Sequence, residues 1–299
     1  MKVSSPDKLL YPDDGITKAQ VVTHFERVAD HLLRYAASRP LTLQRFPSGI
    51  KKSGFMQKNA ADYFPPSIRR LEVPKREGGT TNYAVVEQPE DIPYLANQNT
   101  ITFHMWTSSA DAPHQPDWMI IDLDPEDGDV EKARAATSTI RSILKRFDLD
   151  GFVLATGSKG FHVWVPLAAG HDFTGISLAS RAIAGLAVTE QPDSLTTEFL
   201  KKNRHGRVFV DWLRNAPTAT VVVPFSLRAR PGAPVAVPVG WDELTLARPD
   251  GWKIDSIDDR LDWSTDIDQH LIPVDDIVAA AKAAGVDLDT PHDRFGRTG

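Results

Sequence analysis

Two aspartates, Asp122 and Asp124, stand at the end of an apolar segment with the spacing of a metal-binding pair. The segment runs from Pro116 to Pro125, and the final proline ends strand pairing because it has no N–H to donate. Side chains alternate across a strand, so both aspartates are expected on one face, with Cα atoms roughly 6.5–7 Å apart. Carboxylates at that spacing can reach a shared pair of divalent ions. In the structural alternative, both merely cap the helix predicted near residues 130–147.

A third carboxylate and several cationic side chains also lie at predicted strand ends. Asp211 closes a short apolar strand, and three carboxylates suit hard cations such as Mg²⁺ or Mn²⁺, which prefer oxygen ligands. Lys159 and His162 lie at or just after a turn, and Arg228 ends another strand. They offer phosphate an ammonium, an imidazole and a bidentate guanidinium. Carboxylates for metal combined with cations for phosphate are typical of a nucleotidyl-transfer site.

Each of these basic residues also has a structural reading. A lysine in a Gly-Ser-Lys-Gly turn is commonly exposed and without a role, and Arg228 can pair with a structural acid. A histidine on an apolar strand, such as His104 or His162, commonly bonds to backbone within a core. The turn at residues 157–160 is not a Walker A loop, because it lacks Gly-x-x-x-x-Gly-Lys-Ser/Thr and leads into a strand. That disfavours a P-loop kinase or ATPase.

The composition is that of an ordinary globular protein, with 299 residues, 41% of them hydrophobic and 25% charged. No apolar run approaches the ~20 residues of a membrane span and the N-terminus lacks a signal-peptide core, so a cytoplasmic location without membrane contact is expected. Zero cysteines exclude disulfides and thiolate metal sites. The net charge of −6 argues against a uniformly basic surface, but basic clusters leave a track for a polyanion. They are Lys51–Lys52, Arg69–Arg70, Lys75–Arg76, residues 201–207 and Arg228–Arg230.

Hydrophobic periodicity predicts the elements that position these residues. Thr17 is expected to cap an amphipathic helix over residues 18–37. Two apolar strands at 152–156 and 161–167 flank the glycine-bearing turn as a hairpin. Other strands are predicted at 41–46, 55–58, 83–86, 100–106, 208–212 and 220–228, and other helices at 130–147, 177–187 and 274–284. A glycine-bearing basic loop over 75–82 is expected to be mobile and available to a partner.

The chain shows neither an internal repeat nor a low-complexity linker, which favours one compact domain over residues 1–299. Within it, a smaller N-terminal lobe is expected over about residues 1–115. The carboxylates and the hairpin fall in a catalytic core at about 116–230. Loops, rich in proline, and a final helix make up about residues 231–299.

Four ordered motifs carry a resemblance to a known family. They are Ile121–Pro125, Gly157–His162, Val208–Trp212 and Phe225–Gly232. With them, the chain resembles the polymerase domain of bacterial non-homologous end joining (NHEJ) ligase D, a branch of the archaeo-eukaryotic primase superfamily. The resemblance extends from Asp7 to Leu244. It implies a mixed α+β primase-like fold, with central β-sheets flanked by helices and an RRM-like catalytic core.

The resemblance also implies a role for each candidate residue. Two catalytic Mn²⁺ or Mg²⁺ ions would be bound by Asp122, Asp124 and Asp211. The incoming nucleotide would be held by His104, Thr156, Lys159, His162 and Arg228. The DNA contacts would be Lys8 and Lys18 on a 5′-phosphate and Phe55 stacked on the template. The loop around Gly78–Gly79 matches one that helps bring two DNA ends together.

The chain departs from the family pattern at several positions. Methionine replaces an expected phenylalanine at Met56, threonine an expected serine at Thr156, and Leu213–Arg214 an expected Ser-Gln type pair. Lysines expected at Gln44 and Ala219 are absent. No ligase or nuclease motif accompanies the polymerase motifs, so the chain resembles a stand-alone primase-polymerase.

The predicted function is therefore a template-directed DNA repair nucleotidyltransferase. It would add nucleotides, preferentially ribonucleotides, to a primer 3′-OH at short gaps or broken ends with a 5′-phosphate. Expected partners are DNA, nucleoside triphosphates, an ATP-dependent DNA ligase and a Ku-type end-binding protein, in the bacterial cytoplasm at the nucleoid.

Two alternatives stay open from the sequence. A phosphatase of the haloacid dehalogenase type also places Asp-x-Asp after an apolar strand, but a Thr or Val normally stands where this chain has Glu126. A non-catalytic DNA-end-binding module would use the basic track and the Lys8/Lys18 pair.

Overall fold

The computed structural model describes residues 1–75, 78–263 and 267–290. Within these ranges the strands form two six-stranded sheets and a two-stranded one, made of β1 (Leu9–Tyr11) and β2 (Ile16–Thr17). The first large sheet runs in the order β13 (Thr220–Val222), β7 (Thr100–Trp106), β3 (Pro40–Arg45), β6 (Thr80–Val85) and β5 (Arg69–Pro74), and β4 (Phe55–Gln57) also pairs with β3. The second runs in the order β11 (Leu195–Thr196), β12 (Val208–Asp211), β8 (Trp118–Pro125), β10 (Phe161–Pro166), β9 (Phe152–Ala155) and β14 (Val237–Val239).

The helices occupy the space between and outside the sheets. They are α1 (Lys18–Ala36), α2 (Asp91–Asn97), α3 (Val130–Lys145), α4 (Phe173–Glu190) and α5 (Val274–Ala283), with 3₁₀ turns η1 (Lys201–Asn203), η2 (Leu213–Asn215) and η3 (Asp258–Arg260). The predicted mixed α+β class is confirmed. No helix of the described residues is long and apolar enough to cross a membrane.

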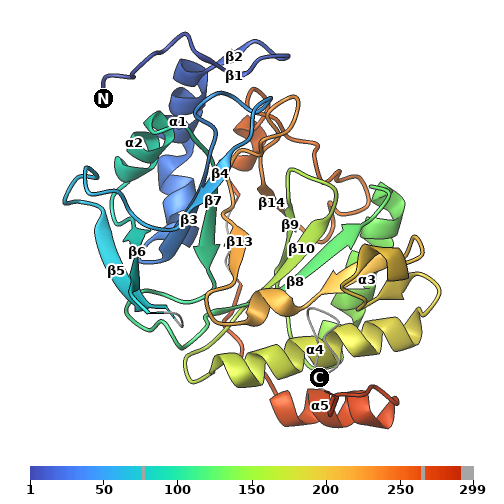
Figure 1. The fold of residues 1–299 in the computed structure, drawn as a ribbon. Coiled ribbons are helices and arrows are strands. Elements are labelled where there is room, and N and C mark those ends of the chain that lie inside the picture. Colours follow the sequence, from blue (N-terminus) through green and yellow to red (C-terminus); the bar gives the residue numbers. More distant parts are fainter. Residues whose placement is uncertain (76–77, 264–266, 291–299) are drawn as a thin grey trace.

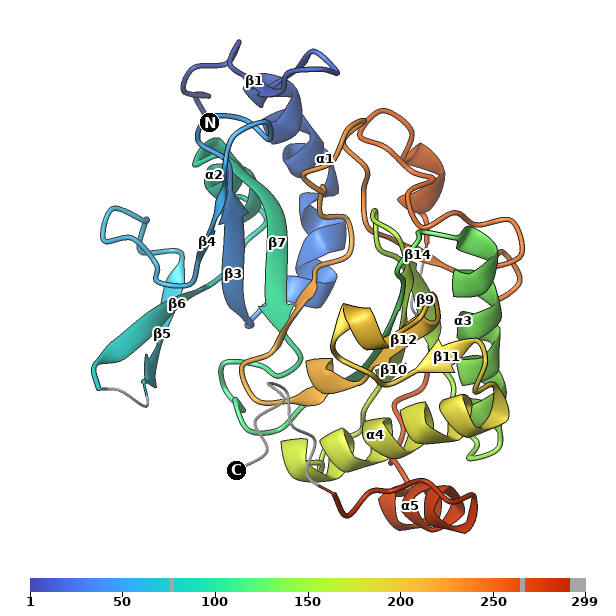
Figure 2. The same ribbon diagram turned by 45° about the vertical axis from the view of Figure 1, so that its right-hand side comes forward.

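Helix α1 begins at the predicted cap. The Thr17 side chain accepts from the backbone N–H of Gln20, and the Gln20 side chain accepts from the backbone N–H of Thr17. Its apolar residues pack against both sheets: the Phe25 ring lies 4.9 Å from that of Phe103 in β7, and the Tyr35 ring 6.2 Å from that of Trp164 in β10. Helix α1 is therefore the layer that joins the two sheets (Figures 1 and 2).

The outer face of the second sheet packs against α3 and α4, and α5 packs against α4 on the side away from the sheet (Figure 1). Met119, Ile121 and Leu123 of β8 are fully buried in that core. Since side chains alternate along a strand, Asp122 and Asp124 project from the other face. The shared face predicted for the two aspartates follows from this register.

Several segments differ from the prediction. The strand expected over 220–228 ends at Val222, because Pro224 has no N–H and Phe225 takes a φ of +67°, so Arg228 lies in a loop. The expected C-terminal loop contains β14, whose Pro238 is tolerated because β14 is an edge strand. The predicted helix over 177–187 is longer at both ends. Strand β5 and helix α2 were not predicted.

The basic loop predicted over 75–82 is shorter, because residues 80–82 already belong to β6; it forms the tip of the β5–β6 hairpin, which extends away from the body of the molecule (Figure 2). Residues 76 and 77 of that loop lie outside the described residues. Gly78 and Gly79 both have positive φ, and the Lys75 backbone N–H donates to the Gly79 carbonyl, so the chain reverses sharply here.

Candidate active site

The three predicted carboxylates lie on one face of the second sheet. Strand β12 is antiparallel to β8, and its register places Asp211 directly opposite Asp122 and Phe209 opposite Asp124. On the other side of β8, His162 of β10 is the partner of Asp122. Directly opposed residues have Cβ atoms about 4.5–5.5 Å apart, so these side chains are immediate neighbours.

The capping alternative for the two aspartates is wrong. Helix α3 is capped by Asp129, whose side chain accepts hydrogen bonds from the backbone N–H groups of Glu131 and Lys132. Asp122 and Asp124 are therefore left for the cavity side of the sheet.

Arg214 is a cation in this site that sequence analysis noted only as a departure from the family. Its Nε lies 3.4 Å from Oδ2 of Asp122, and its Nη2 lies 3.2 Å from Oδ2 of Asp211. Burial raises the pKa of Asp122, and Arg214 opposes that rise. The pKa of Asp124 is raised by burial and then by the charge on Asp122. Desolvated, mutually repelling carboxylates of this kind favour a bound cation.

The donor set fits a hard divalent metal ion by its chemistry, since carboxylate oxygens are the ligands that Mg²⁺ and Mn²⁺ prefer. In the described part of the chain, no three acidic or imidazole side chains are gathered closely enough to enclose an ion as they stand. Arg214 contacts two of the three carboxylates instead. The ligands are thus present, and a cation of the protein lies among them.

A cavity of about 260 Å³ opens beside Asp122 and receives side chains from both sheets. It is lined by Met56, His104, Asp122, His162, Arg214, Thr220, Val221, Val222 and Arg228. Three of the predicted nucleotide ligands, His104, His162 and Arg228, therefore converge although they come from separate parts of the fold.

The two histidines of this cavity are neutral. Burial and the nearby Arg228 lower the pKa of His104 to about 3, and burial lowers that of His162 well below its usual value. His162 Nε2 lies 3.5 Å from Asp122 Oδ1, and within the described residues its buried Nδ1 has no hydrogen-bond partner. Burial also lowers the pKa of Arg228 to about 10, which leaves it a cation at neutral pH.

The other two predicted nucleotide ligands do not line the cavity. Lys159 Nζ donates to the Glu126 carbonyl at 2.9 Å, at the end of β8. The Thr156 hydroxyl is buried and donates to the Gly160 carbonyl at 2.7 Å, while the Thr156 carbonyl accepts from Arg228 Nη1 at 2.7 Å. Thr156 thus contacts the cavity through the guanidinium that it holds.

Glycine is required in the turn between β9 and β10. A Cβ on Gly160 would lie 1.8 Å from the Leu123 carbonyl oxygen, and Gly157 has a φ of +66° with Arg228 Cγ only 2.7 Å from its Cβ position. The turn therefore packs directly on the end of β8 and on Arg228.

A second group of predicted residues lies at the start of α1 and on the first sheet. Lys18 is 2% exposed and its Nζ donates to Ser4 Oγ at 2.6 Å, while Lys8 Nζ donates to Asn99 Oδ1 at 3.4 Å. Burial lowers the pKa of Lys18, and Lys8 and Arg45 lower it further, so the three cations are close neighbours. We call Lys8, Lys18 and Arg45 the cationic cluster; Arg45 was not predicted.

Phe55 adjoins the cationic cluster on strand β4. Its side chain is 48% exposed, and the Arg45 guanidinium lies 5.6 Å from its ring centroid. Phe55 is thus exposed on an edge strand with a cation beside its ring, and stacking on a template base stays a prediction.

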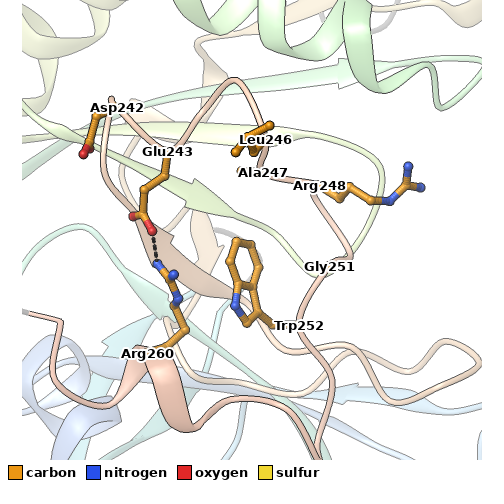
Figure 3. Close-up of a pocket in the computed structure, with 8 residues that line it drawn as sticks. All are labelled: Asp242, Glu243, Leu246, Ala247, Arg248, Gly251, Trp252 and Arg260. Carbon is orange, nitrogen blue, oxygen red and sulfur yellow. Dashed lines mark ion pairs between the residues drawn. The ribbon is translucent and has the colours of Figure 1, made fainter.

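A larger cavity of about 500 Å³ lies elsewhere, in the segment that follows β14 (Figure 3). It is lined by Asp242, Glu243, Leu246, Ala247, Arg248, Gly251, Trp252 and Arg260, with an ion pair of 2.8 Å between Glu243 and Arg260. None of these is among the predicted site residues, so the volume of a cavity alone does not identify the candidate active site.

Comparison with known proteins agrees with this geometry. A family model described as the LigD primase-polymerase domain matches residues 17–267. The chain belongs to this family. The multifunctional NHEJ protein LigD of Mycolicibacterium smegmatis is 31% identical over 278 residues, which cover 92% of this chain and 36% of that protein. The Pseudomonas aeruginosa LigD is 32% identical and the match covers 88% of this chain and 31% of the relative.

A solved structure of the LigD polymerase domain from Mycobacterium tuberculosis, in complex with DNA, is similar over 97% of this chain and 99% of that chain, with a TM-score of 0.76 and 26% identity. The chain spans about a third of the length of the two LigD proteins above. LigD polymerase domains are metal-dependent nucleotidyltransferases, so the predicted family and enzyme class are confirmed. The phosphatase alternative is thereby set aside.

Proposed function

We propose that this chain extends a primer 3′-OH in a template-directed manner at short gaps or broken DNA ends. The observation that most supports this is the register that pairs Asp211 with Asp122, beside a cavity lined by His104, His162 and Arg228. Carboxylates next to neutral imidazoles and a buried guanidinium suit a nucleoside triphosphate with its metal ions. The related proteins are named for NHEJ, and we propose the same repair context here.

Asp122, Asp124 and Asp211 would hold two divalent ions, Mn²⁺ or Mg²⁺. When bound, such ions supply charge stabilisation to the reacting phosphoryl group. The chain itself would orient the triphosphate. Arg228 is held through one N–H by the Thr156 carbonyl and keeps other N–H groups for a phosphate, and His162 lines the same cavity.

The DNA end would bind across the first sheet. In the cationic cluster, Lys18 stands in the first turn of α1, where a cation is unfavourable next to the positive end of the helix dipole. A 5′-phosphate placed there gains from the helix N-terminus and from all three cations. Phe55 would stack on the template base beside it.

Preference for ribonucleotides is proposed to depend on Thr156. Its buried hydroxyl donates to the Gly160 carbonyl and its carbonyl holds Arg228, so Thr156 would act on the sugar by positioning the turn and that guanidinium. Thr156→Val removes the bond to Gly160 with nearly the same side-chain shape and should reduce the ratio of ribonucleotide to deoxyribonucleotide insertion efficiency, whereas Thr156→Ser should keep it. A ratio unchanged by valine would contradict the assignment.

Single-nucleotide insertion on a gapped duplex tests the proposal, with and without a 5′-phosphate and in the presence of Mn²⁺. We expect insertion that depends on the template base, that prefers ribonucleotides and that is stronger with the phosphate. Binding of the gapped DNA without any insertion would instead support the non-catalytic DNA-end-binding module. Filling a gap leaves a nick that must be sealed, so an ATP-dependent DNA ligase is a proposed partner. At broken ends the proposed partner is a Ku-type end-binding protein, and the proposed location is the bacterial nucleoid.

A further inference from the structure

We propose that Arg214 is an internal counter-cation of the carboxylate site and that a divalent ion binds there only by displacing it. The inference rests on the proposed metal-dependent function and adds a competitor to that site. Arg214 Nε lies 3.4 Å from Oδ2 of Asp122, and Nη2 lies 3.2 Å from Oδ2 of Asp211. One guanidinium therefore bridges two of the three carboxylates that would hold the metal ions.

The fold holds this arginine in place through its neighbour Asn215. The Asn215 side chain is fully buried; it accepts from the Ile120 N–H at 2.8 Å and donates to the Ile120 carbonyl at 2.6 Å. It also donates to the Trp212 carbonyl at 2.9 Å. These bonds tie the η2 turn to β8, the strand that carries Asp122. The Arg214 backbone is thus fixed beside the carboxylates, and its contact is part of the architecture.

A metal ion and the guanidinium need the same oxygen atoms. Asp211 already accepts a bond from the Leu213 backbone N–H on Oδ1 at 2.8 Å, so Oδ2, the oxygen facing Arg214, is the one placed toward a shared ion. A doubly charged ion within a few ångströms of an arginine is also repelled by it. Metal binding must therefore exchange the arginine for the ion.

The displaced side chain has space to move. The Arg214 side chain is 41% exposed and lines two cavities, the one of about 260 Å³ with His162 and Arg228 and another of about 450 Å³ with Phe199 and Asp211. A phosphate of a bound nucleotide in the first cavity would offer the guanidinium a new partner. Metal ions and nucleotide would then bind more tightly together than separately.

The test is to titrate the whole chain with Mn²⁺ in the absence of DNA and nucleotide. The electron paramagnetic resonance signal of free Mn²⁺ then measures how much Mn²⁺ is bound. Arg214→Gln should bind Mn²⁺ about tenfold more tightly than wild type, because charge-assisted bonds to the carboxylates no longer compete. Arg214→Lys should fall between the two. The control is Arg248→Gln, which changes net charge equally on an exposed side chain paired with Asp250 and should leave the affinity within about twofold.

The melting temperature gives a second readout. Without metal, in EDTA, Arg214→Gln should melt at a lower temperature than wild type, and excess Mn²⁺ should raise its melting temperature by more than that of wild type. Equal or weaker Mn²⁺ affinity of a folded Arg214→Gln protein would overturn the inference. Asp122→Asn separates the two possible failures. If Mn²⁺ binding needs Asp122 but ignores Arg214, the inference alone fails; if binding is absent or indifferent to Asp122, the proposed metal-dependent function fails with it.

Discussion

The carboxylates of the second sheet and the cationic cluster near α1 carry opposite charges, and they differ in whether the protein supplies a charged partner. Asp122 and Asp211 lie on paired strands, and Arg214 compensates their charge from within the protein. Lys8 donates to the Asn99 side-chain oxygen and Lys18 to the Ser4 hydroxyl oxygen, both of them neutral acceptors. In the described part of the chain, neither lysine has a carboxylate within ion-pair distance.

The difference indicates what each region lacks in the free protein. Burial and the charges of Lys8 and Arg45 lower the pKa of Lys18, so the cationic cluster costs stability until an anion arrives. Local charge conflicts kept by a fold are typical of binding sites. The carboxylate site carries its own counter-charge, whereas the cationic cluster depends on a ligand such as DNA to supply one.

The largest effect is expected from removing a carboxylate of the second sheet. Asp124→Ala should lower nucleotide addition about a thousandfold, because a metal ligand that stabilises the reacting phosphoryl group is lost. The free energy of unfolding should change little, since repulsion from Asp122 is also removed. Single-turnover insertion and thermal melts measure the two quantities, with Asp127→Ala, an exposed acid paired with Lys132, as control. A wild-type insertion rate in the folded variant would remove Asp124 from the site.

The next effect concerns how tightly the catalytic region is packed. Gly160→Ala should lower the free energy of unfolding by about 3 kcal/mol, because its Cβ would lie 1.8 Å from the Leu123 carbonyl oxygen and the turn must shift. Insertion should fall as well, since His162 lies only two residues further along the chain. Urea unfolding measures the change, with Gly175→Ala in α4 as control, where the nearest atom to the added Cβ lies at 3.4 Å. Equal stability of the two variants would contradict this account.

A smaller effect is expected in the DNA-facing region. The double variant Lys8→Ala/Lys18→Ala should bind a recessed end with a 5′-phosphate about tenfold more weakly, with a shallower salt dependence. Insertion at saturating DNA should be nearly unchanged, because neither lysine is near the carboxylates. Lys282→Ala on α5 is the control. If removal of the phosphate weakens the double variant as much as wild type, the phosphate binds elsewhere.

The last prediction tests α1, the helix between the two regions. Burial lowers the pKa of His24 from 6.5 to about 4, although its Nε2 lies 3.2 Å from the Phe225 carbonyl. Between those pH values the unfolded chain binds a proton that the folded chain excludes, so stability falls as pH falls, by about 1.4 kcal/mol per pH unit. His24→Gln should show a shallower decline in urea unfolding between pH 6.5 and about 4.5. Parallel declines would show that His24 is not the group responsible.

Local chemistry made much of this protein predictable from its sequence. The Thr17 cap, the hairpin around Gly157–Gly160 and the strand that ends at Pro125 depend on neighbours a few residues away. Alternation along β8 was enough to put Asp122 and Asp124 on one face. Edge strand β14 was missed because its proline argues against a strand, and nothing local shows that β14 will lie at an edge.

Tertiary structure decided which of these pieces meet. The register of β12 on β8 places Asp211 opposite Asp122. His104 of the first sheet reaches the same cavity because both sheets pack against α1. The pairing of Arg214 with two aspartates could not be predicted either, because a turn has no regular pattern that predicts where its side chains point. The partners of Arg214 depend on the pairing of β8 with β12. Sequence therefore determined the residue types and their faces. Long-range packing determined their neighbours, since the free energy of burying apolar surface is gained only when distant segments come together.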